Sequence, residues 1–342
     1  MPVTDKVSLA FAGFFGLVFG KLMSVVISGK ITGVSADFCE ACSHTAVHIH
    51  NGMLYCFGGG KKGSNYLFRV SEKLSVSSRR PMPCLPRTLN ATCIANNRLY
   101  SLGGCESMLN IHDGLISGDV LSIINLADNS YCEVYLIGVK VPGLVGATLL
   151  PLDSTNILLC GGADSAGQAS SVFYLINTAK YQTSTYCEFP APGIGTSFTL
   201  VDGVIYAFGG QTPGGLLSTL YTMPISESKK ERQWTSHRVP SKVPRRYCHS
   251  ACGHEGYLAI FGGRTETRIL NDMWIYTPQS DEWRKVVCPS SLGGRYSAPM
   301  CSLKEGLLVA GGIGSLAIYG APFIVEPLYS LTKSPVKQVA LI

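Results

Sequence analysis

Five residues near the start of the chain have side chains of the types that bind metal ions. Cys39, Cys42, His44, His48 and His50 lie within one short stretch, and the CxxC spacing suits two zinc ligands. The three histidines occupy alternate positions of a predicted strand, so they share one face and cannot converge on one ion with the cysteines unless the chain bends. No second CxxC is present. The pattern therefore favours a strand over a metal centre, and we expect neither a metal nor a cofactor.

A second group has the types needed for proton transfer. Glu106 follows one double glycine, and Glu266 and Arg268 follow another. A carboxylate beside an arginine can move a proton. However, charged residues in loops are usually solvated. The sequence also contains no nucleophile elbow, phosphate loop, HExxH motif or carboxylate pair. We therefore treat these residues as alternative catalytic candidates only.

A third group consists of arginines that precede an apolar run at the same spacing. They are Arg87, Arg246 and Arg295. Equal spacing before equivalent strands predicts that the three side chains project near the same end of the molecule. A guanidinium offers paired donors that match a carboxylate. The three arginines are thus candidate partner-binding residues, with hydrogen bonding to neighbouring backbone as the structural alternative.

The elements that would position these residues belong to a repeat. Six apolar runs each end in a double glycine, with intervals of 45, 58, 48, 53 and 49 residues. The runs are Tyr55–Gly59, Tyr100–Gly104, Leu158–Gly162, Tyr206–Gly210, Ala259–Gly263 and Leu308–Gly312. A period of this length is typical of propellers and other repeat architectures.

Each repeat contains several short predicted strands. A first apolar run leads through a turn such as Asn51-Gly52 or Asp202-Gly203 into the run that ends in Gly-Gly, which is the pattern of a hairpin. A third run follows a polar loop, and a weaker fourth precedes the next repeat. The predicted third runs are Tyr66–Val70, Val120–Asn125, Val172–Ile176, Thr219–Met223, Asp272–Tyr276 and Pro327–Leu331. Four strands per repeat predict the blades of a β-propeller.

The fifth repeat resembles the kelch family of propellers. It has an arginine and histidine before the first strand (Arg246, His249), then Ile260-Phe261-Gly262-Gly263, and a tryptophan in the fourth run (Trp283). The resemblance covers roughly residues 40–342, although repeats one, three, four and six lack that tryptophan. It implies an all-β, six-bladed kelch-type propeller at residues 36–342. In kelch domains that bind acidic peptides, the arginine position lines one mouth of the ring, and some six-bladed members are sialic-acid mutarotases.

Residues 1–35 form a hydrophobic N-terminal segment. Ser8–Ser28 is interrupted by a single charge, Lys21, and is long enough to cross a bilayer. Three alternatives remain open: a membrane anchor, a cleaved signal, and a ring-closing strand formed by Leu22–Ile31. For the last, Val336–Ile342 is a short candidate for the remaining strand of the sixth repeat.

Composition limits the possible partners and compartments. The net charge of +6 is scattered, and no nucleic-acid motif is present. The 13 cysteines show no disulfide spacing, which favours free thiols in a reducing compartment. We therefore expect a non-catalytic interaction module that binds another protein, with an acidic motif as the favoured target. It would be membrane-associated with the propeller in the cytosol, or alternatively soluble in the cytoplasm. A sugar-binding or mutarotase-like enzyme is the alternative function.

Overall fold

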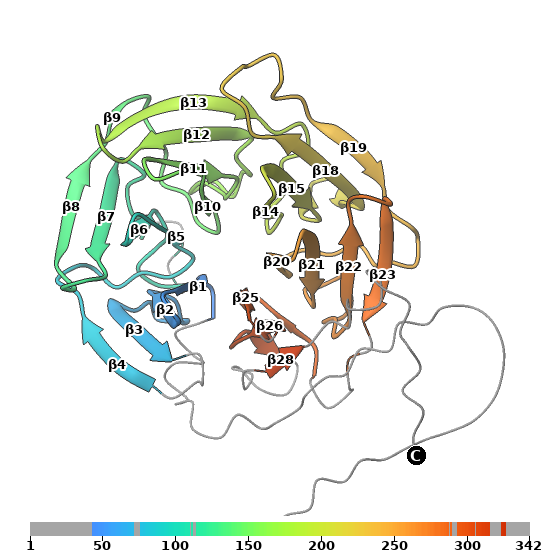
Figure 1. Ribbon diagram of the computed structural model, residues 1–342, viewed down its shortest axis with the longest axis horizontal. Coiled ribbons are helices and arrows are strands. Elements are labelled where there is room, and N and C mark those ends of the chain that lie inside the picture. Colours follow the sequence, from blue (N-terminus) through green and yellow to red (C-terminus); the bar gives the residue numbers. More distant parts are fainter. Residues whose placement is uncertain are drawn as a thin grey trace, which may run out of the picture.

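The computed structural model describes residues 43–71, 76–109, 111, 114–286, 288, 293–304, 306–314 and 323–325. The described residues form strands, turns and loops arranged as a ring of sheets around a central axis (Figure 1). The fold is therefore an all-β propeller, as the repeat predicted. No described segment is a helix of the length and apolarity that a membrane crossing needs. The predicted N-terminal segment, 1–35, lies outside the described residues.

Five sheets have the four-stranded meander expected of a blade. Blade 1 contains β1 (Val47–His50), β2 (Met53–Phe57), β3 (Tyr66–Ser71) and β4 (Val76–Pro81). Blade 2 contains β5 (Ala91–Ala95), β6 (Arg98–Leu102), β7 (Val120–Asn125) and β8 (Tyr131–Tyr135). Blade 3 contains β10 (Thr148–Pro151), β11 (Asn156–Cys160), β12 (Val172–Asn177) and β13 (Gln182–Glu188).

The ring continues through two more blades and one smaller sheet. Blade 4 contains β14 (Ser197–Val201), β15 (Val204–Phe208), β18 (Thr219–Pro224) and β19 (Thr235–Arg238). Blade 5 contains β20 (Ser250–His254), β21 (Tyr257–Phe261), β22 (Met273–Thr277) and β23 (Glu282–Val286). A three-stranded sheet follows, formed by β25 (Met300–Leu303), β26 (Gly306–Val309) and β28 (Phe323–Val325). Two loop hairpins pair β16 (Gln211–Thr212) with β17 (Gly215–Leu216), and β24 (Arg295–Tyr296) with β27 (Ile313–Gly314).

The sixth repeat departs from the expected strand positions. The strand that pairs with β26 is β28, Phe323–Val325, which precedes the predicted range Pro327–Leu331. That range and the candidate fourth strand, Val336–Ile342, both lie outside the described residues. The structure therefore describes five complete blades and one three-stranded sheet, where the sequence predicted six complete blades.

Apolar side chains fill each space between neighbouring sheets. Between blades 1 and 2, Phe57 and Leu67 pack against Leu99 and Ile124. The three-stranded sheet packs on blade 5 through Leu307 and on blade 1 through other residues, so the ring has no open side (Figure 1). Burial of apolar area between sheets is the main stabilising contribution in such a ring.

The double glycines end the second strand of each repeat, where the chain turns with positive φ. Gly103 and Gly104 have φ values of 60° and 87°. A Cβ on Gly103 would lie 2.5 Å from the carbonyl oxygen of Leu144, in the connection to the next blade. Glycine is required because neighbouring backbones approach this closely. The loops at this end, between second and third strands and between consecutive blades, form what we call the glycine face.

Candidate functional site

The three repeat arginines all lie at the glycine face, just before the first strand of a sheet, and all are buried. Arg87, Arg246 and Arg295 are 2%, 0% and 7% exposed. Arg246 Nη1 donates to the carbonyl of Gly262, and Arg295 Nη1 donates to that of Gly311, which are the first glycines of their own repeats. The sequence correctly placed the three at one end of the ring. Their role in binding a partner stays a prediction.

Arg246 makes a full set of contacts. Its Nη1 and Nη2 lie 2.8 and 2.9 Å from the two carboxylate oxygens of Asp272, and its Nε donates to the carbonyl of Pro244. Burial alone would raise the pKa of Asp272, but the hydrogen bonds and charge of Arg246 outweigh it and hold that pKa below its usual value. A paired, fully hydrogen-bonded guanidinium of this kind is a structural element of blade 5.

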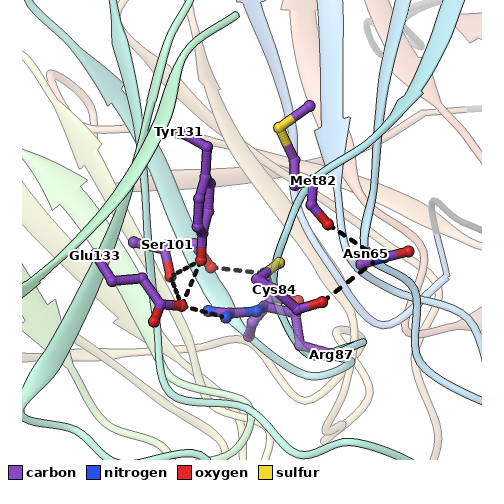
Figure 2. Close-up of polar contacts among 9 residues, drawn as sticks. Asn65, Met82, Cys84, Arg87, Ser101, Tyr131 and Glu133 are labelled. Carbon is purple, nitrogen blue, oxygen red and sulfur yellow. Dashed lines mark hydrogen bonds and ion pairs between the residues drawn. The ribbon is translucent and has the colours of Figure 1, made fainter.

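Arg87 is bound much less completely. Its Nη2 forms a long ion pair of 3.5 Å with Oε1 of Glu133 on β8 (Figure 2). Its Nε and Nη1 are buried and have no hydrogen-bond partner among the described residues. Its guanidinium also lies over the ring of Phe57, 5.6 Å from the centroid. A buried N–H without a partner costs about 1–3 kcal/mol, so Arg87 has unused binding capacity.

The contrast between the two arginines follows from the third strand. Asp272, the partner of Arg246, lies two residues before Trp274, whereas Val120 lies two residues before Ser122 in blade 2, so no carboxylate stands at the equivalent place there. Ser101 pairs with Ser122 in blade 2, and Ile260 pairs with Trp274 in blade 5, each two residues before the double glycine. Trp274 Nε1 donates to Asp272 and helps to fix the carboxylate beside Arg246. In blade 2 the small Ser122 stands at this place and donates instead to Glu133, which reaches in from β8.

A short polar chain holds Glu133 in position. Its Oε1 accepts from the hydroxyl groups of Tyr131 and Ser122. Figure 2 shows Tyr131 directed at the carboxylate of Glu133. Burial and the adjacent carboxylate of Glu133 raise the pKa of Tyr131. The sequence analysis did not single out Glu133, because an acidic residue in an outer strand normally faces solvent.

Three loops, one of which contains Arg87, bond to one another. Ser64 and Arg87 exchange backbone hydrogen bonds of 3.1 and 3.0 Å, and Thr88 and Cys105 do the same at 2.8 and 2.9 Å. The Met108 N–H donates to the carbonyl of Lys61. These bonds join residues 58–65, 82–90 and the described part of 103–118 into one surface, which we call the blade 1–2 loop surface.

This loop surface presents apolar and basic side chains to solvent. Leu85 and Leu109 are 58% and 73% exposed. Lys61 and Lys62 are exposed on the loop that bonds to Met108. Two exposed leucines beside two lysines suit a segment that carries both apolar and acidic side chains.

The histidines form contacts between sheets. His48 Nε2 lies 2.8 Å from Thr92 Oγ1, His50 Nε2 lies 2.8 Å from Asn97 Oδ1, and His249 Nε2 lies 2.8 Å from Ser197 Oγ. No group of three or more His, Cys, Asp or Glu side chains in the described part of the chain could hold a metal ion. Cys39 and Cys42 lie outside that part.

The alternative catalytic residues do not share one site. Glu106 is exposed on the blade 2 loop, whereas Glu266 and Arg268 are exposed on the loop between β21 and β22 of blade 5. Blades 2 and 5 stand on opposite sides of the ring (Figure 1). Their catalytic role stays a prediction that no contact among the described residues supports.

Comparison with known proteins agrees with this geometry. The model of the KLHDC2/KLHL20/DRC7 Kelch-repeats domain matches residues 89–312. The chain belongs to the kelch-repeat family. The repeat arginine, the double glycine and the four-stranded blade are therefore family features in this kelch propeller.

Curated relatives share only part of their length with this kelch chain. The Leucine-zipper-like transcriptional regulator 1 homolog of Drosophila melanogaster is 23% identical over 72% of this chain, and the match covers 27% of the fly protein. The Kelch repeat and BTB domain-containing protein 1 of Ectromelia virus is 31% identical over 39% of this chain and 23% of its own. Tip elongation aberrant protein 3 of Schizosaccharomyces pombe is 24% identical over 53% and 19%. The chain thus spans about a quarter or less of these relatives.

A solved structure shows the same fold. The chain described as "Structure of YjhT" superposes with a TM-score of 0.67, at 14% identity, over 82% of this chain and 93% of that one. Identity at this level supports the propeller architecture and carries no site residue.

Proposed function

We propose that this kelch propeller is a non-catalytic interaction module that binds an acidic segment of another protein on the blade 1–2 loop surface. The observation that carries the proposal is Arg87, whose Nε and Nη1 are buried without a partner beneath that surface. A carboxylate from a partner could accept hydrogen bonds from these donors once the loops around Arg87 separate, and charge-assisted hydrogen bonds of this kind are among the strongest in proteins.

The surroundings of Arg87 support the same target. Lys61 and Lys62 are exposed on one loop, and Leu85 and Leu109 are exposed on the two loops bonded around it. Binding energy in interfaces concentrates on a few residues, among which arginine is enriched, within a polar rim. Arg246, by contrast, uses its donors in hydrogen bonds to Pro244 and Asp272. Arg87 is therefore the better candidate to donate hydrogen bonds to a ligand.

Quantitative affinity capture from the native cell tests this proposal. The double variant Lys61→Glu/Lys62→Glu and the single variant Leu109→Asp should each lose the main captured partner. A matched control is Lys229→Glu/Lys230→Glu, which reverses two exposed lysines in the loop between β18 and β19, at the opposite end of the blades. A partner list that is the same for wild type and all three variants would contradict the proposal.

We also propose that the three-stranded sheet is the sixth blade and that a fourth strand completes it. It occupies the position between blades 5 and 1 and packs on both. Its edge strand β28 is third in the order of the sheet, and in each complete blade a fourth strand pairs with the third. Leu22–Ile31 and Val336–Ile342 are the two candidates, and the deletion that lowers the unfolding midpoint identifies the strand.

The hydrophobic N-terminal segment also determines where we expect the protein to be located. We propose that Ser8–Ser28 tethers the propeller to a membrane on its cytosolic side, unless Leu22–Ile31 is the closing strand. Carbonate extraction separates the two cases. Release of the full-length chain into the supernatant would refute insertion in the bilayer.

A further inference from the structure

The outer rim between blades 2 and 3 carries an apolar stripe on an extended segment. Tyr135, Ile137 and Val139 are 79%, 62% and 42% exposed. Val134 and Leu136, which alternate with the first two of them, point the other way and pack into the core between the two blades. Alternate residues of an extended chain share a face, so the three apolar side chains form one row.

A short strand holds this segment in place. β9 (Ile137–Gly138) pairs in parallel with β13, at the start of that strand (Figure 1). The Ile137 and Val139 N–H groups donate to the carbonyls of Tyr181 and Thr183. The segment therefore continues from the edge strand of blade 2 directly into the edge strand of blade 3.

Most other outer edges of the ring carry exposed charges. β4 has Arg79 and Arg80, β19 has Arg238, and β23 has Glu282, Arg284 and Lys285. Charged side chains on an edge strand discourage the addition of another strand. The β8–β9 segment contains one charge, Glu133, and its carboxylate is engaged by Tyr131, Ser122 and Arg87. This edge is thus left without the usual protection.

Charges at the margin of the stripe indicate what would bind there. Lys140 follows Val139 directly, and Lys180 precedes Tyr181, whose carbonyl accepts the Ile137 N–H; both lysines are exposed. A second copy of this chain would bring the same lysines and an already engaged Glu133. A partner with acidic residues matches these charges better.

We propose that the β8–β9 rim is a second docking edge, which accepts an extended segment of another protein. That segment would have apolar side chains at alternate positions and an acidic residue at one end. Main-chain hydrogen bonds to the edge would give affinity, and the stripe and lysines would give selectivity. This edge lies on the rim, apart from the loop surface proposed above, so the two sites can be tested separately.

A phage-displayed library of random dodecapeptides, selected against the full chain, tests the proposal. Peptides enriched by the wild type should alternate apolar residues and carry Asp or Glu. Tyr135→Lys/Ile137→Lys and Lys140→Glu/Lys180→Glu should each weaken their binding by at least about tenfold. Ile194→Lys, which changes an exposed apolar residue in the connection between blades 3 and 4, should leave binding unchanged.

Two further measurements keep the result decisive. Hydrogen exchange of the backbone amides of residues 132–139 should slow when a selected peptide is bound. The Lys140→Glu/Lys180→Glu variant retains the apolar core, so its loss of binding cannot be assigned to misfolding if its unfolding midpoint is unchanged. Enriched peptides that bind all variants equally would overturn the proposal. So would a dimer, detected by light scattering, that only Tyr135→Lys/Ile137→Lys dissociates.

Discussion

Arg246 and Asp272 form a bidentate pair within blade 5, with nitrogen–oxygen distances of 2.8 and 2.9 Å. In blade 2 the guanidinium of the corresponding arginine, Arg87, has one polar partner among the described residues, Glu133, at 3.5 Å. The same repeat position thus serves as a structural element in one blade and keeps unused donors in another.

Removing the carboxylate of that pair should destabilise the propeller. Asp272→Asn leaves the guanidinium of Arg246 buried without its counter-charge, which typically costs about 3–5 kcal/mol. Urea unfolding followed by fluorescence measures the change. Glu282→Gln removes an exposed ion pair with Arg284 and is the control, for which we expect no measurable change. Equal midpoints for Asp272→Asn and wild type would show that the pair is not structural.

Acid should destabilise the ring through buried histidines. Burial, together with the positive charge of Arg246, lowers the pKa of His249 to about 3, and burial lowers that of His44 to about 4. The unfolded chain binds protons near pH 6.5 whereas the folded chain does not, so stability falls as pH drops below that value. Each such histidine contributes a slope of about 1.4 kcal/mol per pH unit.

A substitution isolates one of these groups. His249→Gln removes a titrating side chain while keeping a polar group that can reach Ser197. The loss of unfolding free energy between pH 7.5 and pH 5 should be smaller in this variant than in the wild type. Ser197→Ala, which removes the hydrogen-bond partner and leaves the buried histidine in place, is the matched control and should keep the pH dependence of the wild type. An identical pH dependence in His249→Gln would contradict the assignment.

A comparison of two glycines separates the cost of left-handed backbone from the cost of close contact between loops. Gly63 lies in the blade 1–2 loop surface, and Gly167 lies in a loop of blade 3. Gly63 and Gly167 both have φ of +73°, but a Cβ on Gly63 would lie 2.1 Å from the carbonyl oxygen of Glu106, whereas Gly167 faces open space. Left-handed backbone should lower the unfolding free energy of both alanine variants by about 1–2 kcal/mol. Gly63→Ala should cost about 1–3 kcal/mol more, because the two loops must separate.

Thermal unfolding compares the two variants, and affinity capture reports on function. Gly63→Ala should also weaken partner binding at the loop surface, and Gly167→Ala should not. If both variants lose the same stability and neither changes binding, the close approach of the loops has no role in the site.

Cys132 should be the thiol that reacts first among the described cysteines. It is the exposed one of that set and lies on the edge strand β8. Burial raises the pKa of Cys248 and of Cys288 to about 11, which suppresses their thiolates at neutral pH. Brief treatment with iodoacetamide and peptide mass spectrometry should find label at Cys132, and Cys132→Ser should remove it. Faster labelling of Cys93 or Cys160 would contradict the burial that the structure gives them.

The sequence was sufficient for the blades because their signals are local. The predicted third run Val120–Asn125 is β7, and Thr219–Met223 lies within β18. Turn glycines and apolar runs specify a hairpin through neighbours in the chain. The sequence also predicts the fourth run of repeat four at Gln233-Trp234-Thr235. However, β19 begins at Thr235, and Trp234 Nε1 donates to the carbonyl of Glu188 in the preceding blade.

The candidate site was harder to predict because it depends on distant pairs. That Arg87 and Arg246 share a position follows from spacing alone. That one is fully paired and the other is not depends on the start of the third strand, where Asp272 of blade 5 corresponds to Val120 of blade 2. The β9 pairing was missed for the same reason: two residues joined to a strand 45 positions away leave no periodic signal.

The pairing of β9 with β13 also gives the ring a preferred order of opening. Among the described residues, blades 2 and 3 are the neighbouring blades whose outer strands are joined by backbone-to-backbone hydrogen bonds. Thr183 Oγ1 adds to this junction, since it lies 3.0 and 2.6 Å from the carbonyl oxygens of Ile137 and Val139. Transient separation of the ring should therefore begin at another junction. Blades 2 and 3 would remain together as one cooperative unit, and their backbone amides should be the last to exchange in native-state hydrogen exchange.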